Sequence, residues 1–183
     1  MNDFPAVLLI RVRSEKLKKF FLGPLVSSYR GWLGGFMTEE IRDGNSRSGY
    51  SLRTLDGESA VLASRALVSP VSFNKYGVNL DALNVTAAAA LRRARDGKAA
   101  AVIDELGSMC LKAPAFMDEV ISLFSSGFPA LVTVREGASL FLDTVSALKG
   151  CVPVELTEER VADADGEARA WLDFHIRMKG VSR

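Results

Sequence analysis

Two consecutive carboxylates, Asp104 and Glu105, follow the apolar segment 99–103. A short apolar run of this kind is typical of a strand buried on both faces, so the two acids are expected at its carboxyl end. There the first acid could hold a magnesium ion, and the second could orient or deprotonate an attacking water molecule, as phosphoryl transfer requires. The alternative is a strand end with two solvated acids, and the spacing alone does not decide between them.

The segments around this pair alternate between short apolar runs and longer amphipathic stretches. The apolar runs predict strands at 6–10, 99–103, 130–134 and 152–156. Capping residues, helical spacing and closing glycines predict helices over 14–22, 79–97, 114–126, 139–149 and from Thr157 through Trp171. The first helix is expected to be interrupted at Gly23 and Pro24, with a second helical segment resuming from Pro24.

Turn-forming residues divide the chain between the first strand and the acidic pair. Asp43-Gly44-Asn45 and Asp56-Gly57 separate the runs 36–42, 48–55 and 58–63, which predicts an antiparallel meander at about 36–63. Elsewhere strands alternate with helices, the pattern of an α/β fold with a mainly parallel sheet. In such a sheet ligands bind at the carboxyl ends of the strands. These ends are expected at residues 10–11, 103–105, 134–135 and 156–157.

Composition narrows the class of protein further. The 183 residues are 48% hydrophobic, enough for one buried core, so a single domain over 1–183 is expected. The 23 Lys and Arg nearly cancel the 22 Asp and Glu, which argues against a nucleic-acid or membrane partner. We find no secretory signal pattern, spanning segment or disulfide framework, so the expected compartment is the cytoplasm.

Several short motifs resemble, in family order, those of the small P-loop nucleoside triphosphatases known from thermophiles and from a human cancer-related homologue. Residues 103–109 (IDELGSM) resemble the family signature I-D-E-I-G-K-M, and residues 35–42 (GFMTEEIR) resemble G-F-x-T-E-E-V-R. Residues 76–79 (YGVN) and 156–160 (LTEER) resemble Y-G-V-D and L-T-P-E-N-R. Each match alone is weak, but together they run from about residue 6 to residue 160.

The resemblance implies a three-layer P-loop-type α/β fold and magnesium-dependent hydrolysis of nucleoside triphosphates to diphosphates. It assigns Asp104 to magnesium, Glu105 to the attacking water and Arg160 to the γ-phosphate. It also places Thr38 and Glu39 in the nucleotide cleft. Two alternatives stay open: Arg160 could pair with a nearby acid at a helix start, and Thr38 and Glu39 could form the charged face of a hairpin.

One family motif is missing. The phosphate loop G-x-x-x-x-G-K-T falls on residues 12–19 (VRSEKLKK), where both glycines and the threonine are replaced. The glycines allow backbone N–H groups to curl around a phosphate, and Val12 and Leu17 would resist that path. Only Lys18 keeps the position of the phosphate lysine, and Glu15 would repel phosphate if it faces the pocket. The alternative for Lys18 is a solvated lysine on an amphipathic helix.

Two functions therefore remain open. In the first, the chain is a family member with a degenerate phosphate loop that binds nucleotide poorly and serves as a binding or regulatory module, with an unidentified protein partner. In the second, it is an active hydrolase with a remodelled phosphate site that uses Lys18 and the helix start at Ser14. Loss of the charge-assisted bonds of the loop favours the first.

Three further features are assigned structural roles. His175, the only histidine, is expected on the solvent side of the last helix without a metal. Cys110 is interpreted as a small buried hydrophobe rather than a nucleophile. The cluster of basic residues between Arg11 and Lys19 is interpreted as a solvated helix face, although it could contact phosphate or RNA.

Overall fold

One mixed sheet of nine strands organises the computed structural model, which describes residues 4–135 and 151–181. The strands are β1 (Val7–Val12), β2 (Leu33–Asp43), β3 (Ser46–Thr54), β4 (Ser59–Ser64), β5 (Ser72–Phe73), β6 (Tyr76–Val78), β7 (Ala100–Ile103), β8 (Ala130–Arg135) and β9 (Cys151–Leu156). The helices are α1 (Glu15–Ser28), a π-helical turn (Ala82–Ala87), α2 (Ala88–Gly97), a 3-10 turn (Cys110–Lys112), α3 (Pro114–Ser125) and α5 (Val161–Val181). The predicted helix at 139–149 lies outside the described residues.

The four strands β7-β8-β1-β9 lie side by side in that order and form most of the parallel half of the sheet, which the start of β2 completes. β1 pairs in parallel with both β8 and β9, and β7 pairs in parallel with β8. This arrangement confirms the prediction that the apolar runs before residues 11, 104, 135 and 157 lie parallel in one sheet. Their carboxyl ends consequently meet at one edge, where the sheet can present side chains from several strands to a ligand.

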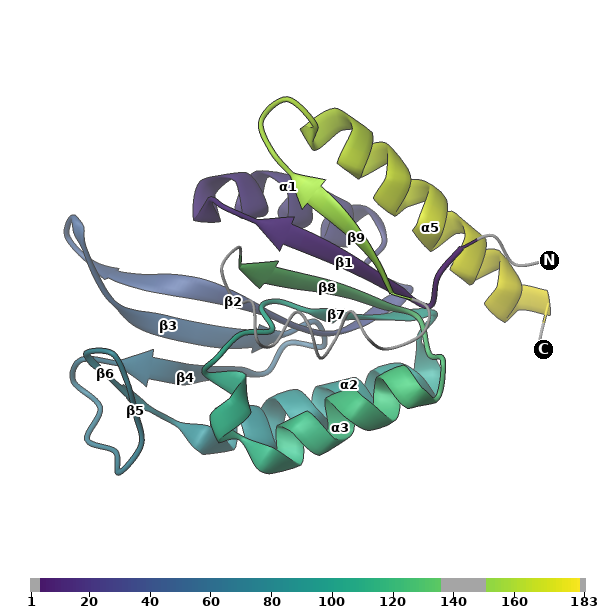
Figure 1. Cartoon of the computed structure of the whole chain (residues 1–183). Coiled ribbons are helices and arrows are strands. Elements are labelled where there is room, and N and C mark those ends of the chain that lie inside the picture. Colours follow the sequence, from purple (N-terminus) through teal and green to yellow (C-terminus); the bar gives the residue numbers. More distant parts are fainter. Residues whose placement is uncertain (1–3, 136–150, 182–183) are drawn as a thin grey trace.

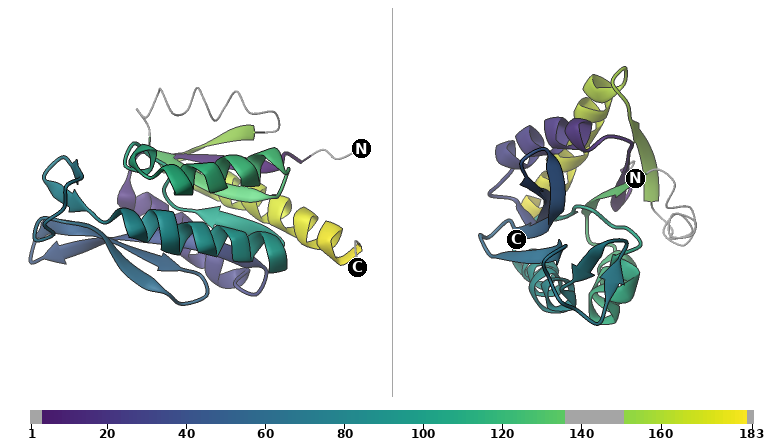
Figure 2. Two further views of the ribbon diagram at one scale, coloured as in Figure 1. Left: turned by 90° about the horizontal axis from the view of Figure 1, so that it is seen from below. Right: turned by 90° about the vertical axis from the view of Figure 1, so that its left-hand side faces the viewer.

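Helices cover both faces of this parallel half (Figures 1 and 2), which gives the three layers expected of the fold. The alternation of side chains along β1 explains the division, because Leu8 and Ile10 pack on the α1 and α5 side while Leu9 packs on the α2 and α3 side. Both sets are buried. A strand buried on both faces has no solvated side, which is why the run from Val7 to Ile10 is continuously apolar.

The antiparallel meander of β2, β3 and β4 extends the same sheet, which confirms the meander predicted at about 36–63. β2 has two roles, since its first residues, Leu33 to Phe36, pair in parallel with β7 before the strand turns to β3. Gly35 makes this possible: its φ is +96°, and a Cβ there would lie 2.1 Å from the carbonyl oxygen of Val102. The short β5–β6 hairpin at the outer edge was not predicted.

The prediction that Gly23 and Pro24 interrupt the first helix is wrong. α1 is one helix with Pro24 inside it. A proline within a helix costs about 3 kcal/mol because one hydrogen bond is lost. Four apolar side chains of α1 are buried against the sheet, and each contributes about 1.5–3 kcal/mol, which outweighs that cost. They are Phe21, Leu22, Leu25 and Val26.

The predicted start of the last helix at Thr157 is also wrong. Residues 157–160 form a turn in which the Arg160 N–H donates to the Thr157 carbonyl (3.2 Å), and α5 begins at Val161. β9 hydrogen-bonds to β1 as far as Leu156, so the chain must first turn away from the sheet before a helix can run back across it.

Among the described residues, no helix is both long and apolar enough to cross a membrane.

His175 does not face solvent as predicted. It is buried on α5, where its Nε2 lies 3.1 Å from the carbonyl oxygen of Pro5 and its ring contacts Trp171 edge-on. Trp171 donates to the same carbonyl (2.7 Å). The two side chains are four residues apart, one helical turn, so burial of the large indole also carries the imidazole inward.

Burial lowers the pKa of His175, although its hydrogen bond to Pro5 acts in the opposite direction. The folded protein therefore binds this proton less tightly than the unfolded chain does. The titration of His175 leaves the free energy of unfolding unchanged above about pH 6.5 and lowers it as the pH drops from there towards the folded pKa. We expect the melting temperature of the wild type to fall more between about pH 7.5 and pH 5.5 than that of His175→Gln. Glutamine keeps a donor for Pro5 without titrating, so equal falls in both proteins would contradict this assignment.

Candidate functional site

Ionisable side chains from three elements converge at the carboxyl edge of the parallel strands. Asp104 and Glu105 directly follow β7, Lys18 lies in the first turns of α1 after β1, and Arg135 is the last residue of β8. The Lys18 Nζ lies 3.0 Å from Asp104 Oδ1, which confirms the prediction that the acidic pair and the region after the first strand lie together. The site therefore occupies the position where open α/β sheets bind ligands.

Asp104 is fully buried, and both of its oxygens have partners. The Thr133 hydroxyl donates to Oδ1 (2.5 Å) beside the Lys18 ammonium, and the Thr38 backbone N–H donates to Oδ2 (3.1 Å). Burial raises the pKa of Asp104, whereas Lys18, Thr133 and Thr38 act in the opposite direction. The alternative of a solvated acid is therefore wrong for Asp104.

Lys18 is held by three carboxylates. Its Nζ lies 3.0 Å from Asp104, 3.2 Å from Glu15 and 3.6 Å from Glu105, and only 3% of its side chain is exposed. Burial by itself would lower the pKa of Lys18, but the attraction of these carboxylates is larger, so the pKa is raised and the ammonium stays charged. The alternative of a solvated lysine on an amphipathic helix is consequently wrong.

Arg135 completes the cluster and was not assigned to the site from the sequence. Its Nε and Nη2 lie 3.3 and 3.0 Å from the two carboxylate oxygens of Glu105, and the same Nη2 lies 2.9 Å from Glu15. Burial lowers the pKa of Arg135, but Glu105 and Glu15 outweigh it and raise the pKa overall. The sequence signal for Arg135 is its place at the carboxyl end of an apolar run, at the edge of the sheet where ligands bind.

The connection from β1 to α1 consists of Arg13 and Ser14 alone. The Ser14 hydroxyl caps the helix by accepting from the Leu17 N–H (3.3 Å), and the Ser14 carbonyl accepts from the Lys18 N–H (2.9 Å). None of residues 12–19 has a positive φ. Strand and helix are thus joined by a short turn in ordinary backbone conformations.

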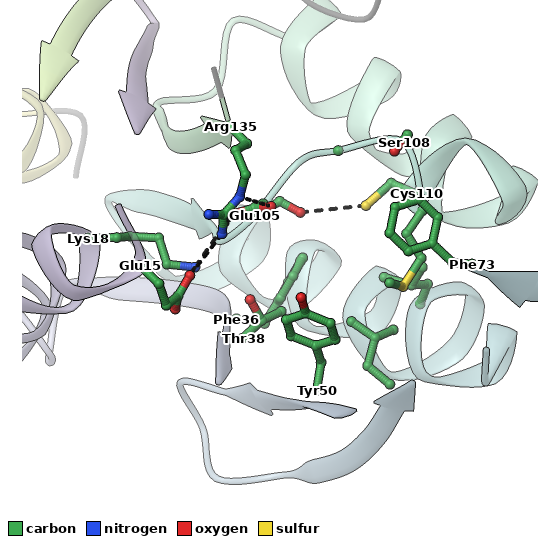
Figure 3. A pocket seen from close by; sticks show the side chains of 14 residues that line it. Glu15, Lys18, Phe36, Thr38, Tyr50, Phe73, Glu105, Ser108, Cys110 and Arg135 are labelled. Atoms are coloured by element: carbon green, nitrogen blue, oxygen red, sulfur yellow. Dashed lines mark hydrogen bonds and ion pairs between the residues drawn. The ribbon is translucent and has the colours of Figure 1, made fainter. Parts of the chain in front are cut away.

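A pocket of about 90 Å³ opens beside this cluster (Figure 3). One end is charged and carries Glu15, Lys18, Glu105 and Arg135. The other end is mostly apolar and includes side chains from the meander, the β5–β6 hairpin, the π-helical turn, and the loop and 3-10 turn after Glu105. They are Phe36, Tyr50, Leu62, Phe73, Leu83, Met109 and Cys110.

A family model described as NTPase matches residues 26–166. The nucleoside-triphosphatase THEP1 of Thermotoga maritima is 36% identical over 142 residues, which cover 78% of this chain and 82% of that protein. The chain belongs to this NTPase family.

The NTPase-family fold is supported independently by solved structures. The crystal structure of THEP1 from the hyperthermophile Aquifex aeolicus superposes with a TM-score of 0.76 at 24% identity, covering 86% of this chain and 96% of that one. The solution structure of a human cancer-related nucleoside triphosphatase gives a TM-score of 0.66 at 24% identity and covers 97% and 98% of the two chains. These similarities confirm the α/β fold predicted from the resemblance.

The other positions taken from the NTPase-family motifs are only partly brought to the site. Thr38 lines the pocket and bonds Asp104 through its backbone, while Glu39 is exposed and lines a second hollow beside Lys19 and Asp104. Arg160 is half-exposed at the start of α5 and lies 3.7 Å from Glu167. It is not among the residues that line either hollow.

Cys110 has a structural role in this NTPase-family chain, whereas the basic residues between Arg11 and Lys19 have different surroundings. Cys110 is buried and its Sγ lies 3.6 Å from the Glu105 carbonyl, while burial raises the pKa of the thiol to about 11. It therefore remains protonated at neutral pH, as expected of a small buried hydrophobe. The basic cluster is not one solvated face, because Lys18 is buried and Arg11 pairs with Glu155 (3.1 Å).

Proposed function

We propose that this NTPase-family chain has a degenerate phosphate loop and acts as a binding or regulatory module that hydrolyses nucleoside triphosphates weakly or not at all. One observation carries the proposal: the two cations that line the pocket, Lys18 and Arg135, are already paired with the chain's own carboxylates. A phosphate would have to displace those carboxylates before it could bind, and each charge-assisted bond is worth about 1.5–3 kcal/mol.

The backbone of residues 12–19 supports the same proposal. A phosphate cradle needs several consecutive N–H groups directed into one concavity, often with positive φ. Here Val12 is buried as part of β1, the connection has two residues, and Ser14 already accepts the N–H groups of Leu17 and Lys18. The match to the family model also begins at residue 26, beyond this segment.

Magnesium, which the family reaction implies, does not fit the described residues. Both oxygens of Asp104 accept bonds from protein donors, and the Lys18 ammonium at 3.0 Å would repel a cation. Lys19 stands where the family motif has the threonine whose hydroxyl ligates magnesium. In the described part of the chain, no three His, Cys, Asp or Glu side chains are arranged to hold a metal.

The remaining candidate is an active hydrolase with a remodelled phosphate site. It is favoured by the close approach of Lys18 to both acids of the family signature, at 3.0 Å from Asp104 and 3.6 Å from Glu105. In that case Glu105 would act on the attacking water and Lys18 would contact the phosphates. Arg135 would have to release Glu105 first, since both carboxylate oxygens are engaged.

We expect the purified protein with ATP or GTP and magnesium to release phosphate no faster than buffer, about a thousandfold or more below an intact enzyme, because several charge-assisted contacts are missing. The nucleoside-triphosphatase THEP1 of Thermotoga maritima is the positive control for the phosphate-release assay.

Robust turnover that is lost in Glu105→Gln would refute the proposal and favour the active hydrolase. A low turnover that is abolished in Lys18→Ala but unchanged in Lys16→Ala would assign that activity to this site. Lys16 is the matched control because it lies on the same helix and is exposed.

A further inference from the structure

Glu15 bridges the two cations of the site. Its Oε2 lies 3.2 Å from Lys18 Nζ and 2.9 Å from Arg135 Nη2, so one carboxylate oxygen contacts cations from α1 and from the end of β8 (Figure 3). The spacing of three residues places Glu15 and Lys18 on the same face of α1. Neither cation depends on Glu15 alone, because Lys18 also contacts Asp104 and Arg135 also contacts Glu105.

We propose that Glu15 is an internal anion that occupies an oxyanion site formed by Lys18 and Arg135, and that this contact excludes phosphate-bearing ligands from the pocket. The inference rests on the proposed function, since it concerns the regulation of the same site. It adds a specific residue and ligand class: the site accepts a tetrahedral oxyanion when Glu15 is removed or displaced.

The chemistry of the two cations supports an oxyanion ligand. An arginine presents a planar fork of N–H donors and a lysine presents a compact point charge, and the two together are a frequent means of binding phosphate oxygens. The site also lies at the N-terminus of the 14-residue helix α1, where the helix dipole favours an anion. A carboxylate oxygen and a phosphate oxygen therefore compete for the same position.

The local charge balance explains why an external anion is excluded. Three carboxylates, Glu15, Asp104 and Glu105, surround two cations, which leaves an excess of one negative charge. Without Glu15, two acids face two cations, so the cluster has no net charge and its net repulsion of an anion is removed.

The burial of these side chains allows Glu15 to leave without loss of the fold. Lys18 and Asp104 are 3% and 1% exposed, whereas Glu15 is 18% exposed and Arg135 is 39% exposed. Glu15 thus lies nearer the mouth of the site, as the first residue of α1, and a change of its rotamer would open the site while the Lys18–Asp104 pair stays in place.

The test is calorimetric titration of inorganic pyrophosphate, without magnesium, into the wild type, Glu15→Gln and Asp118→Asn. Asp118 is exposed on α3 and outside the pocket, so Asp118→Asn makes the same change in net charge away from the site. We expect Glu15→Gln to bind pyrophosphate about tenfold or more tightly than the wild type, with Asp118→Asn unchanged. Adding Arg135→Gln to Glu15→Gln should remove the gain.

A folded Glu15→Gln that binds pyrophosphate no better than the wild type would overturn the inference, as would an equal gain in Asp118→Asn. Melting curves establish folding, and Glu15→Ala provides a second variant if the glutamine is not accommodated. Failure of the proposed function is a separate result, because it appears as phosphate release by the wild type and not as a change in pyrophosphate affinity.

Discussion

Replacing Lys18 by methionine is expected to lower the free energy of unfolding by about 3–5 kcal/mol, the usual cost of leaving one partner of a buried ion pair without the other. The methionine keeps most of the side-chain volume but removes the ammonium that lies 3.0 Å from Asp104. Because Asp104 is fully buried, water cannot replace the lost charge without disturbing the sheet edge. Chemical denaturation followed by circular dichroism would measure the difference.

The matched control is Lys16→Met, which removes an exposed lysine from the same helix and should change stability by less than about 0.5 kcal/mol. The double variant Lys18→Met/Asp104→Asn removes both charges and should recover a large part of the loss, since no unpaired buried charge remains. Equal stabilities of Lys18→Met and Lys16→Met would show that the buried Lys18–Asp104 pair does not stabilise the fold.

Gly35→Ala is expected to destabilise the protein by about 2–5 kcal/mol, since a left-handed backbone conformation and a steric clash act together. The φ of +96° is strained for any residue with a Cβ, and the new methyl group would lie 2.1 Å from the Val102 carbonyl oxygen. Relief of this clash requires β2 to move away from β7. The next residue, Phe36, accepts a backbone hydrogen bond from Asp104 (3.2 Å), so we also expect a disturbed site.

Gly57→Ala separates the two causes. Gly57 has a φ of +108°, but no atom lies within 4 Å of the position of an added Cβ. This variant should lose only about 1–2 kcal/mol, the conformational part of the cost. Equal losses of stability in Gly35→Ala and Gly57→Ala, measured by thermal denaturation, would contradict a steric cost from the close contact between β2 and β7.

Local patterns were sufficient where one physical cause controls the outcome. The apolar runs around Leu9 and Val102 predicted buried parallel strands because only a strand covered on both faces has no polar side. The acids after the second run then had to lie at the carboxyl edge, and the structure places Asp104 there beside Lys18. The motif resemblance, now supported by the family match, extended these patterns to a three-layer fold.

Local patterns failed where distant contacts outweigh a local preference. Pro24 lies inside α1 because the helix buries an apolar face, and Thr157 forms a turn because β9 continues to Leu156. His175 is buried because it shares a helix face with Trp171. In each case the outcome depends on how the element packs against the rest of the fold, which the local sequence pattern does not contain.

Residue type and spacing along single segments are sufficient to predict the strand and helix alternation, the position of the acidic pair and the lack of a G-x-x-x-x-G-K-T motif. The partners of the charges, in contrast, follow from the tertiary fold. Arg135 is 120 residues from Glu15 and 30 from Glu105, yet its guanidinium contacts both. The energy of a charged group depends on its burial and on the charges within a few ångströms, and those neighbours are set by packing of the whole sheet rather than by spacing along the chain.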